Sequence, residues 1–358
     1  MGASDARCEA IVWWSIDGSA AEREYMHAES PEAGRTAADT GAGAAATSLV
    51  VAMLTFRRPD DLRVALPALV EQATSVADRF QRVEVLVVDN DPAESAREFV
   101  TSSPPLESVV VTYRCESESG ITAARNRALA EAASSDLLVF IDDDERPSER
   151  WLADLVDTFQ RGDAVAVVGP VVSRFEVEPS SWIVAGEFFT RRRMPTGTAV
   201  SVAATNNLLL DLRVVREIGL AFDTAFGHAG GEDTMFTRTL HANGGRLVWC
   251  DEAIVWDIVP AARSTRDWVV RRAFSSGNSW SQTSIALEGS TRGRFVARMR
   301  CIARGLVRTA GGLVRALLGV VSGSLRHRAK GVRTTARGLG MIAGALGYSY
   351  EEYRRSEG

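Results

Sequence analysis

The sequence contains little cysteine or histidine. Its four cysteines, Cys8, Cys115, Cys250 and Cys301, are far apart and form no CxxC pair, and its four histidines form no cluster. Neither a disulfide framework nor a zinc site with cysteine or histidine ligands is therefore predicted. A reducing compartment, the cytoplasm, is the simpler interpretation.

Long apolar runs are missing as well. No stretch approaches the roughly 20 residues that a membrane-spanning helix needs. The N-terminus lacks the basic and apolar regions of a secretory signal. If the protein meets a membrane, we expect it to do so peripherally. No GxGxxG motif follows a predicted strand, which argues against a dinucleotide oxidoreductase.

The composition predicts a globular protein with unevenly distributed charge. The 358 residues are 46% hydrophobic and 24% charged, enough for one large domain with appendages. The formal net charge of -5 argues against a general nucleic-acid binder. Residues 1–47 have no hydrophobic period and are predicted to be a poorly ordered leader. Between Glu288 and Glu351 no acidic residue occurs, whereas arginine is frequent.

Apolar strand-like runs alternate with helical stretches from residue 48 onward. This alternation predicts an α/β fold with a mostly parallel sheet flanked by helices. Ligands of such sheets bind beyond the carboxyl ends of the strands. Thr55, Asp89 and Asp142 each end one of these runs. The predicted strands are 48–55, 83–89, 108–114 and 136–142, with helices near 93–101 and over 121–133.

The acidic run Asp142-Asp143-Asp144-Glu145 directly follows an apolar strand. Carboxylates crowded at a strand end repel one another, so a bound cation would favour the arrangement. Oxygen ligands suit Mg²⁺ or Mn²⁺, which can bridge to a diphosphate. A solvated acidic loop that caps the next helix is the alternative.

Three further features have both a functional and a structural interpretation. Asp89 could accept hydrogen bonds from a base or a ribose, or it could be a turn residue. The segment from Gly120 through Arg125 and Asn126 opens a helix that could approach a ligand, or it could be a plain cationic helix face. Asp233, in the turn Gly-Gly-Glu-Asp, could act as a general base, or it could serve a helix N-terminus.

Taken in order, these motifs resemble family 2 glycosyltransferases of the GT-A fold. The resemblance extends over roughly Ser48 to Trp280, and we expect a catalytic domain over 48–288. The basic composition that follows predicts an amphipathic helical tail over 289–358. The stretch FDTAFGHAGGEDTMFTRTLHANGGRLVWCDEAIVW is most similar to bacterial exopolysaccharide transferases of the succinoglycan-biosynthesis type. The fold expected is therefore a GT-A nucleotide-diphospho-sugar transferase fold with a C-terminal helical extension.

The resemblance also implies roles for single residues. Asp233 matches the catalytic base, with Glu232 beside it, and Asp142 and Asp144 match the DxD pair at the ribose and the Mn²⁺ or Mg²⁺ ion. We expect the remaining residues to bind the nucleotide sugar or the acceptor. The nucleotide-sugar positions are Thr55, Arg57, Asp89, Arg125, Asn126, Asp142 and Asp143. The acceptor positions are Asn206, Gly231 and His228, with an ordinary loop histidine as the alternative for His228.

Two departures from the family pattern shape the expected activity. The QxxRW motif and the membrane spans of processive synthases are absent, which favours transfer of a single sugar. Where many GT-A enzymes have a late histidine ligand, this sequence has Asp257, a candidate third metal ligand. We expect inverting transfer from a UDP-sugar to a glycan or lipid-linked saccharide.

Two other functions remain open on the residues alone. A non-catalytic nucleotide-sugar-binding scaffold would not need the base Asp233. A sugar-nucleotide pyrophosphorylase would have a glycine-rich loop after its first strand, and LTFRRPDDL has no glycine.

The arginines from Arg292 to Arg337 recur among apolar residues, as in a cationic amphipathic helix. Such a segment can lie on anionic lipid at the inner face of the cell membrane. The alternatives are a helix packed on the catalytic domain and an oligomer contact.

Overall fold

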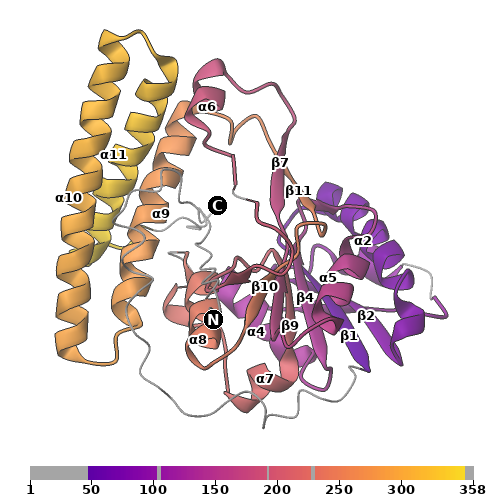
Figure 1. Cartoon of the computed structure of the whole chain (residues 1–358). Coiled ribbons are helices and arrows are strands. Elements are labelled where there is room, and N and C mark those ends of the chain that lie inside the picture. Colours follow the sequence, from indigo (N-terminus) through magenta and orange to yellow (C-terminus); the bar gives the residue numbers. More distant parts are fainter. Residues whose placement is uncertain (1–46, 103–105, 192, 227–229, 351–358) are drawn as a thin grey trace, which may run out of the picture. The chain divides into compact units, whose positions relative to one another are not determined.

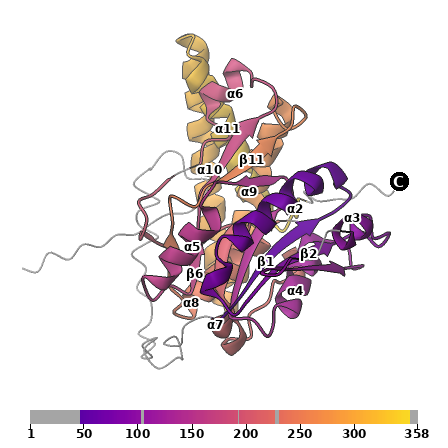
Figure 2. The same cartoon turned by 90° about the vertical axis from the view of Figure 1, so that its right-hand side faces the viewer.

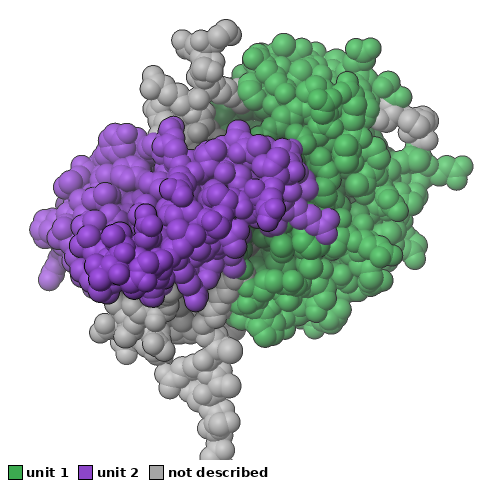
Figure 3. Space-filling view, turned by 90° about the horizontal axis from the view of Figure 1, so that it is seen from above, with its two compact units in different colours: residues 1–172, 191–222, 236–256 green, residues 173–190, 223–235, 257–358 purple. Residues whose placement is uncertain are grey.

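The computed structural model describes residues 47–102, 106–191, 193–226 and 230–350. The chain divides into two compact units, shown in green and purple in Figure 3. Unit 1 takes its described residues from 1–172, 191–222 and 236–256, and unit 2 takes its own from 173–190, 223–235 and 257–358. Apart from Thr47, the predicted leader lies outside the described residues, and so does His228.

Unit 1 contains an eight-stranded mixed sheet. Its strands are β1 (Ser48–Thr55), β2 (Arg82–Asp89), β3 (Val110–Cys115), β4 (Leu137–Asp142), β6 (Ala166–Val168), β8 (Ala199–Val200), β9 (Asn207–Asp211) and β10 (Leu247–Trp249). Their order is β3-β2-β1-β4-β9-β6-β10-β8. Strands β3, β2, β1 and β4 are parallel, and β9 runs antiparallel to β4 and β6. The predicted α/β class is confirmed.

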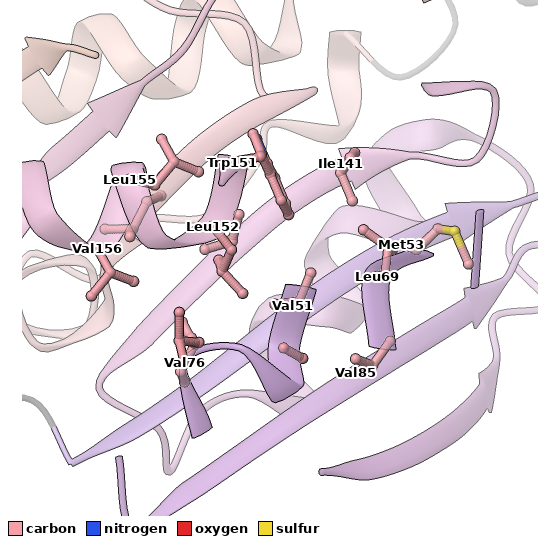
Figure 4. Close-up of a cluster of buried hydrophobic side chains, with 14 of the residues drawn as sticks. Val51, Met53, Leu69, Val76, Val85, Ile141, Trp151, Leu152, Leu155 and Val156 are labelled. Atoms are coloured by element: carbon pink, nitrogen blue, oxygen red, sulfur yellow. The ribbon is translucent and has the colours of Figure 1, made fainter. Parts of the chain in front are cut away.

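Helices cover both faces of this sheet because successive strand residues point to opposite sides. In β1, Leu49, Val51 and Met53 belong to one apolar cluster, whereas Val50 and Ala52 belong to the other. Figure 4 shows part of the first cluster, which includes side chains of α2 and α5. The helices of unit 1 are α2 (Pro59–Thr74), α3 (Arg97–Thr101), α4 (Ile121–Glu131), α5 (Trp151–Gln160) and α7 (Leu212–Glu217), with a 3-10 turn at Ala77–Arg79. Helices α2 and α4 lie on opposite sides of β1 and β2 (Figures 1 and 2).

The apolar run 165–172 is divided between two strands. Strand β6 ends at Val168, and β7 (Val171–Phe175) belongs to a three-stranded sheet of order β5-β11-β7, with β5 (Glu145–Pro147) and β11 (Val255–Val259). Gly169 lies between β6 and β7. A Cβ atom there would lie 2.2 Å from the carbonyl oxygen of Ala253, so the close approach of the two backbones requires glycine.

Unit 2 is dominated by three long helices, α9 (Arg266–Ala286), α10 (Thr291–Val321) and α11 (Leu325–Ala345), which Figure 1 shows side by side. Unit 2 also contains α6 (Ser181–Gly186), a 3-10 turn at Thr224–Phe226, and the first residues of α8 (Glu232–Ala242). Glycines bring α10 and α11 close together. A Cβ atom on Gly305 would lie 2.8 Å from the carbonyl oxygen of Gly338, and one on Gly312 would lie 2.8 Å from that of Gly331.

The range predicted as a basic helical tail contains the two helices α10 and α11. Gly323, in the left-handed region with φ 69°, lies in the turn between them. The predicted domain boundaries at residues 47 and 288 stay predictions. In residues 47–350, as far as they are described, no helix combines the length and the apolar character needed to span a bilayer.

The C-terminal half of α10 exposes large apolar side chains. Eight of them are more than half exposed: Leu306, Val307, Leu313, Val314, Leu317, Leu318, Val320 and Val321. We call these eight residues the outer face of α10. The small residues Cys301, Gly305, Gly312 and Gly319 of the same helix are buried. Large side chains thus point outward from α10, and small ones point inward.

Candidate active site

The strand order of unit 1 places Thr55 and Asp142 at a topological switch point. From β1 the chain proceeds to β2 and β3 on one side, and then returns to β4 on the other side of β1. Leu54 pairs with Asp142 in the parallel register. Loops diverge at such a point and leave room for a ligand beyond the carboxyl ends of the strands. The loops after β1 and β4 contain Arg57, Arg58, Asp143 and Asp144.

Asp143 connects these two loops. Its Oδ2 accepts a hydrogen bond from the Thr55 hydroxyl at 2.8 Å, and its Oδ1 accepts one from Arg58 Nη1 at 2.8 Å. The same Arg58 nitrogen lies 2.9 Å from Asp144 Oδ2. Only 4% of the Asp143 side chain is exposed, against 19% for Asp144. A single guanidinium thus contacts two neighbouring carboxylates and offsets part of their negative charge.

Glu145 connects the acidic run to Asn206 through hydrogen bonds. Its Oε2 accepts a hydrogen bond from the Asp142 backbone N–H at 3.1 Å, and its Oε1 accepts one from Asn206 Nδ2 at 2.5 Å. Glu145 is 2% exposed. Asn206, a predicted acceptor residue, is thereby brought to the same loop as Asp142. Its Oδ1 is buried without a hydrogen-bond partner.

Burial makes negative charge costly in this cluster. It raises the pKa of Asp143 to about 6, with a further increase from Asp144, although Arg58 acts in the opposite direction. Burial also raises the pKa of Asp142, which the charge of Arg125 partly offsets. For Arg58, burial lowers the pKa, but the attraction of Asp143 and Asp144 outweighs it and the net pKa is raised. Added positive charge would therefore stabilise the ionised cluster.

The cluster fits a divalent cation by its chemistry. Carboxylate oxygens at Asp142 and Asp144 are the ligand type that Mg²⁺ and Mn²⁺ prefer. A cationic group, the Arg58 guanidinium, lies against two of the carboxylates. In the described part of the chain, however, no three side chains of His, Cys, Asp or Glu gather into a metal-binding group.

Asp89 organises the loop that follows β2. It is fully buried; its Oδ1 accepts the N–H of Asp91 at 3.0 Å, and its Oδ2 accepts the N–H of Ala96 at 2.9 Å and the Tyr113 hydroxyl at 3.1 Å. Asp91 in turn binds Arg57 through Nε at 3.1 Å and Nη2 at 3.2 Å. The hydrogen bond and the charge of Arg57 hold the pKa of Asp91 below its usual value. The predicted role of Asp89 in nucleotide binding stays a prediction.

Asn90 connects this loop to the start of α4. Its Nδ2 donates to the carbonyl oxygens of Glu116 at 2.9 Å and Glu118 at 2.6 Å, and its Oδ1 accepts the N–H of Gly120 at 3.0 Å. Gly120 has φ 125°, which only glycine adopts readily. The loops after β2 and β3 are thus held together at the same edge of the sheet.

Helix α4 presents the two predicted donor-binding residues differently. Arg125 is 6% exposed, and its guanidinium carbon lies 5.6 Å from the centre of the Phe222 ring. The Asn126 amide forms two hydrogen bonds with the Phe222 backbone, donating to its oxygen at 2.9 Å and accepting from its nitrogen at 2.8 Å. Asn126 therefore holds Phe222 in place, and its contact with the nucleotide sugar stays a prediction.

The turn with the proposed base lies in unit 2. Gly230 and Gly231 have φ of 73° and 101°, and α8 starts at Glu232. A Cβ atom on Gly231 would lie 3.1 Å from the Thr283 side chain of α9, so the turn packs closely against that helix. The Asp233 carboxylate accepts the N–H of Thr234 at 2.6 Å.

The remaining predicted residues of unit 2 take separate positions. Glu232 is 4% exposed. Asp257, the candidate third metal ligand, lies in β11, and its Oδ2 is 3.4 Å from the Ser173 hydroxyl. His228 lies outside the described residues. The roles of these residues in catalysis, metal binding and acceptor binding stay predictions.

Arg58, Asn90 and Asp91 were not assigned roles from the sequence. The pair Arg57-Arg58 directly after a strand was the available signal for Arg58. Its partners are 85 and 86 positions further along the chain, which sequence spacing cannot reveal.

The fold and the carboxylate-lined switch point define a glycosyltransferase with the GT-A fold. The model of glycosyl transferase family 2 matches residues 50–219, and that of glycosyl transferase family group 2 matches residues 137–326. The chain belongs to glycosyltransferase family 2, which makes it a transferase that uses a nucleotide-sugar donor. The expected family, fold and transferase activity are confirmed.

Two curated relatives and one solved structure agree with this assignment. The succinoglycan biosynthesis protein ExoM of Rhizobium meliloti is 33% identical over 229 residues, which cover 64% of this chain and 72% of that protein. Glucosyl-dolichyl phosphate glucuronosyltransferase of Haloferax volcanii is 27% identical over 225 residues, 57% of this chain and 68% of that protein. The structure of the mannosyltransferase PcManGT from Pyrobaculum calidifontis, in complex with GDP-Man and Mn²⁺, has a TM-score of 0.52 at 16% identity. It covers 83% of this chain and 87% of its own, and it shows the fold.

Proposed function

We propose that this protein transfers one sugar, with inversion, from a UDP-sugar to a glycan or lipid-linked saccharide acceptor. The observation that supports this most directly is the set of carboxylates at the switch point, where Thr55 and Arg58 hold Asp143 between two loops. A nucleoside diphosphate bound beyond the strand ends would meet these loops. The absence of a QxxRW motif supports single-sugar transfer.

Each of these residues has a distinct role in the proposed reaction. Asp142 and Asp144 would hold Mg²⁺ or Mn²⁺, which when bound neutralises the charge of the departing diphosphate. Asp233 takes the proton of the acceptor hydroxyl. The acceptor oxygen forms a bond to the anomeric carbon as the bond from that carbon to the diphosphate oxygen breaks on the opposite side. An α-linked donor thus yields a β-linked product.

The relatives support the proposed metal and acceptor classes. The Pyrobaculum enzyme binds Mn²⁺ together with GDP-Man. The Haloferax relative is named for a reaction with glucosyl-dolichyl phosphate, a lipid-linked saccharide, and the Rhizobium relative for the biosynthesis of the polysaccharide succinoglycan.

A panel of nucleotide sugars, with and without Mn²⁺ or Mg²⁺, tests the proposal. We expect one donor to raise the melting temperature in a metal-dependent way and to release nucleoside diphosphate slowly. Asp233→Asn should keep donor binding and lose transfer. Asp163→Asn, at an exposed carboxylate that pairs with Arg246, is the control for charge removal. Donor binding without release by the wild-type protein, even with acceptor, would favour the scaffold function instead.

We also propose that the outer face of α10 lies on the anionic inner surface of the cell membrane. The outer face consists of large exposed apolar residues. The helix that carries it, α10, contains many arginines and no acidic residue. Apolar side chains can enter the boundary between headgroups and acyl chains, while arginines near the surface contribute about 1 kcal/mol each. Such contact would bring the protein to the surface on which lipid-linked acceptors lie.

Flotation with vesicles tests this location. Leu317→Glu places a charge on the outer face of α10, where the side chain is 65% exposed, so the fold should tolerate it. We expect at least a fivefold loss of binding to vesicles containing phosphatidylglycerol. Leu339→Glu, at a 46% exposed leucine of α11, is the matched control. Equal losses in both variants, or equal binding of the wild type to neutral vesicles, would contradict the proposal.

A further inference from the structure

The Arg58 guanidinium contacts the carboxylates that are proposed to bind the metal ion. Arg58 is the residue before α2, with Pro59 fixing the first helical position. Its Nη1 atom is 2.8 Å from Asp143 Oδ1 and 2.9 Å from Asp144 Oδ2. One nitrogen thus bridges two carboxylates that follow one another in the chain. Without a positive group between them, these carboxylates would repel each other in a partly buried loop.

The two carboxylates that Arg58 contacts differ in their exposure. Asp143 is 4% exposed and has a second partner, the Thr55 hydroxyl, so it is fixed from both sides. Asp144 is 19% exposed, and its Oδ2 is the oxygen that Arg58 contacts. Asp144 is also the residue expected to bind the metal. An oxygen that is 2.9 Å from a guanidinium cannot readily approach a divalent cation at about 2.1 Å, because the two positive charges would then repel strongly.

We propose that Arg58 is a built-in counter-ion that competes with the divalent metal for Asp144. This inference rests on the proposed metal site. Arg58 holds the acidic loop in a defined conformation without metal, and it lowers the affinity for the free ion. A diphosphate favours metal binding because it supplies the negative charge and oxygen ligands that offset Arg58. Metal and donor are therefore bound together rather than the metal first.

Arg57 provides a matched control for this inference. It is the adjacent residue with the same charge, but its guanidinium pairs with Asp91 through Nε and Nη2 rather than with the acidic loop. Arg57→Gln removes one positive charge from the same turn, so it measures the general electrostatic effect on metal affinity. Arg58→Lys keeps the positive charge at this position.

The experiment is Mn²⁺ titration of the full-length protein without nucleotide, followed by calorimetry or by the electron paramagnetic resonance signal of free Mn²⁺. For Arg58→Gln we expect the dissociation constant to fall by about tenfold or more. We expect a change of about threefold or less for Arg57→Gln and for Arg58→Lys. Addition of UDP should bring the Mn²⁺ dissociation constants of Arg58→Gln and the wild type closer together.

Thermal unfolding gives a second measurement that does not depend on activity. Without metal, Arg58→Gln should have a lower melting temperature than the wild type. Mn²⁺ should raise the melting temperature of Arg58→Gln by more than it raises that of the wild type. Equal or weaker Mn²⁺ binding by Arg58→Gln, or a gain matched by Arg57→Gln, would overturn the inference. If Arg58→Gln gains affinity while the wild type releases no nucleoside diphosphate from any donor, the proposed transfer fails and the role of Arg58 stands.

Discussion

Replacement of Asp89 by alanine should destabilise unit 1 and weaken donor binding. The substitution leaves three donors without their acceptor: the backbone N–H groups of Asp91 and Ala96, and the Tyr113 hydroxyl. Hydrogen bonds to a charged group contribute about 1.5–3 kcal/mol each and are not additive when they share one carboxylate. We therefore expect a loss of about 3–5 kcal/mol, a large part of the roughly 5–15 kcal/mol of a typical domain.

Urea unfolding, followed by the fluorescence of buried tryptophans such as Trp151, measures this loss, and calorimetry measures UDP affinity. Asp136→Ala is the control. Asp136 accepts hydrogen bonds from the backbone and side chains of Thr47 and Ser48 at the opposite ends of the strands. It should lose stability but keep its UDP affinity. A stability of Asp89→Ala within about 1 kcal/mol of wild type, or equal losses of UDP affinity in both variants, would refute the reasoning.

Three further predictions concern the stability of the fold. The pKa of Glu187 is lowered mainly by its hydrogen bond from Lys330. This pair therefore stabilises the fold fully above pH 4.5, the ordinary pKa of glutamate, and the stabilisation is lost as the pH falls through the lower pKa that Glu187 has in the folded protein. Below about pH 4.5, the melting temperature of Lys330→Met should depend less on pH than that of the wild type. Gly312→Val should cost about 1–3 kcal/mol, because its side chain would press on the backbone of α11, and a melting temperature equal to that of wild type would contradict this close packing. Asn126→Ala should cost about 1–3 kcal/mol in urea unfolding, since the two hydrogen bonds to Phe222 are lost.

The first four strands could be predicted from the sequence almost to the residue. Strands β1, β2 and β4 are buried over most of their length, and such apolar runs are distinctive when turn residues bound them. Strand β3 is a partly exposed edge strand, and it begins two residues later than predicted, at Val110. The predicted helix over 93–101 is shorter in the structure, where α3 begins at Arg97. The reason is the Asp89 carboxylate, which accepts the N–H of Ala96 and fixes the preceding loop in a non-helical form.

The acidic run and its position after β4 could also be predicted, but its counter-ions could not. Arg58 and Asp143 are far apart in sequence and meet only because β1 and β4 are neighbours. The sequence likewise did not reveal that Asn126 binds a backbone segment 96 residues away. Residue type indicates what a side chain can do, whereas the partner is set by the topology.

In α10, different residues determine the packing against α11 and the character of the exposed surface. Its glycines set the distance to α11, whereas the large side chains of the outer face are each more than half exposed. Mutations on that face can therefore accumulate without altering the backbone of the helical pair. Homologous enzymes could acquire different surface preferences by changes confined to this one face, while the spacing of the helices is inherited unchanged.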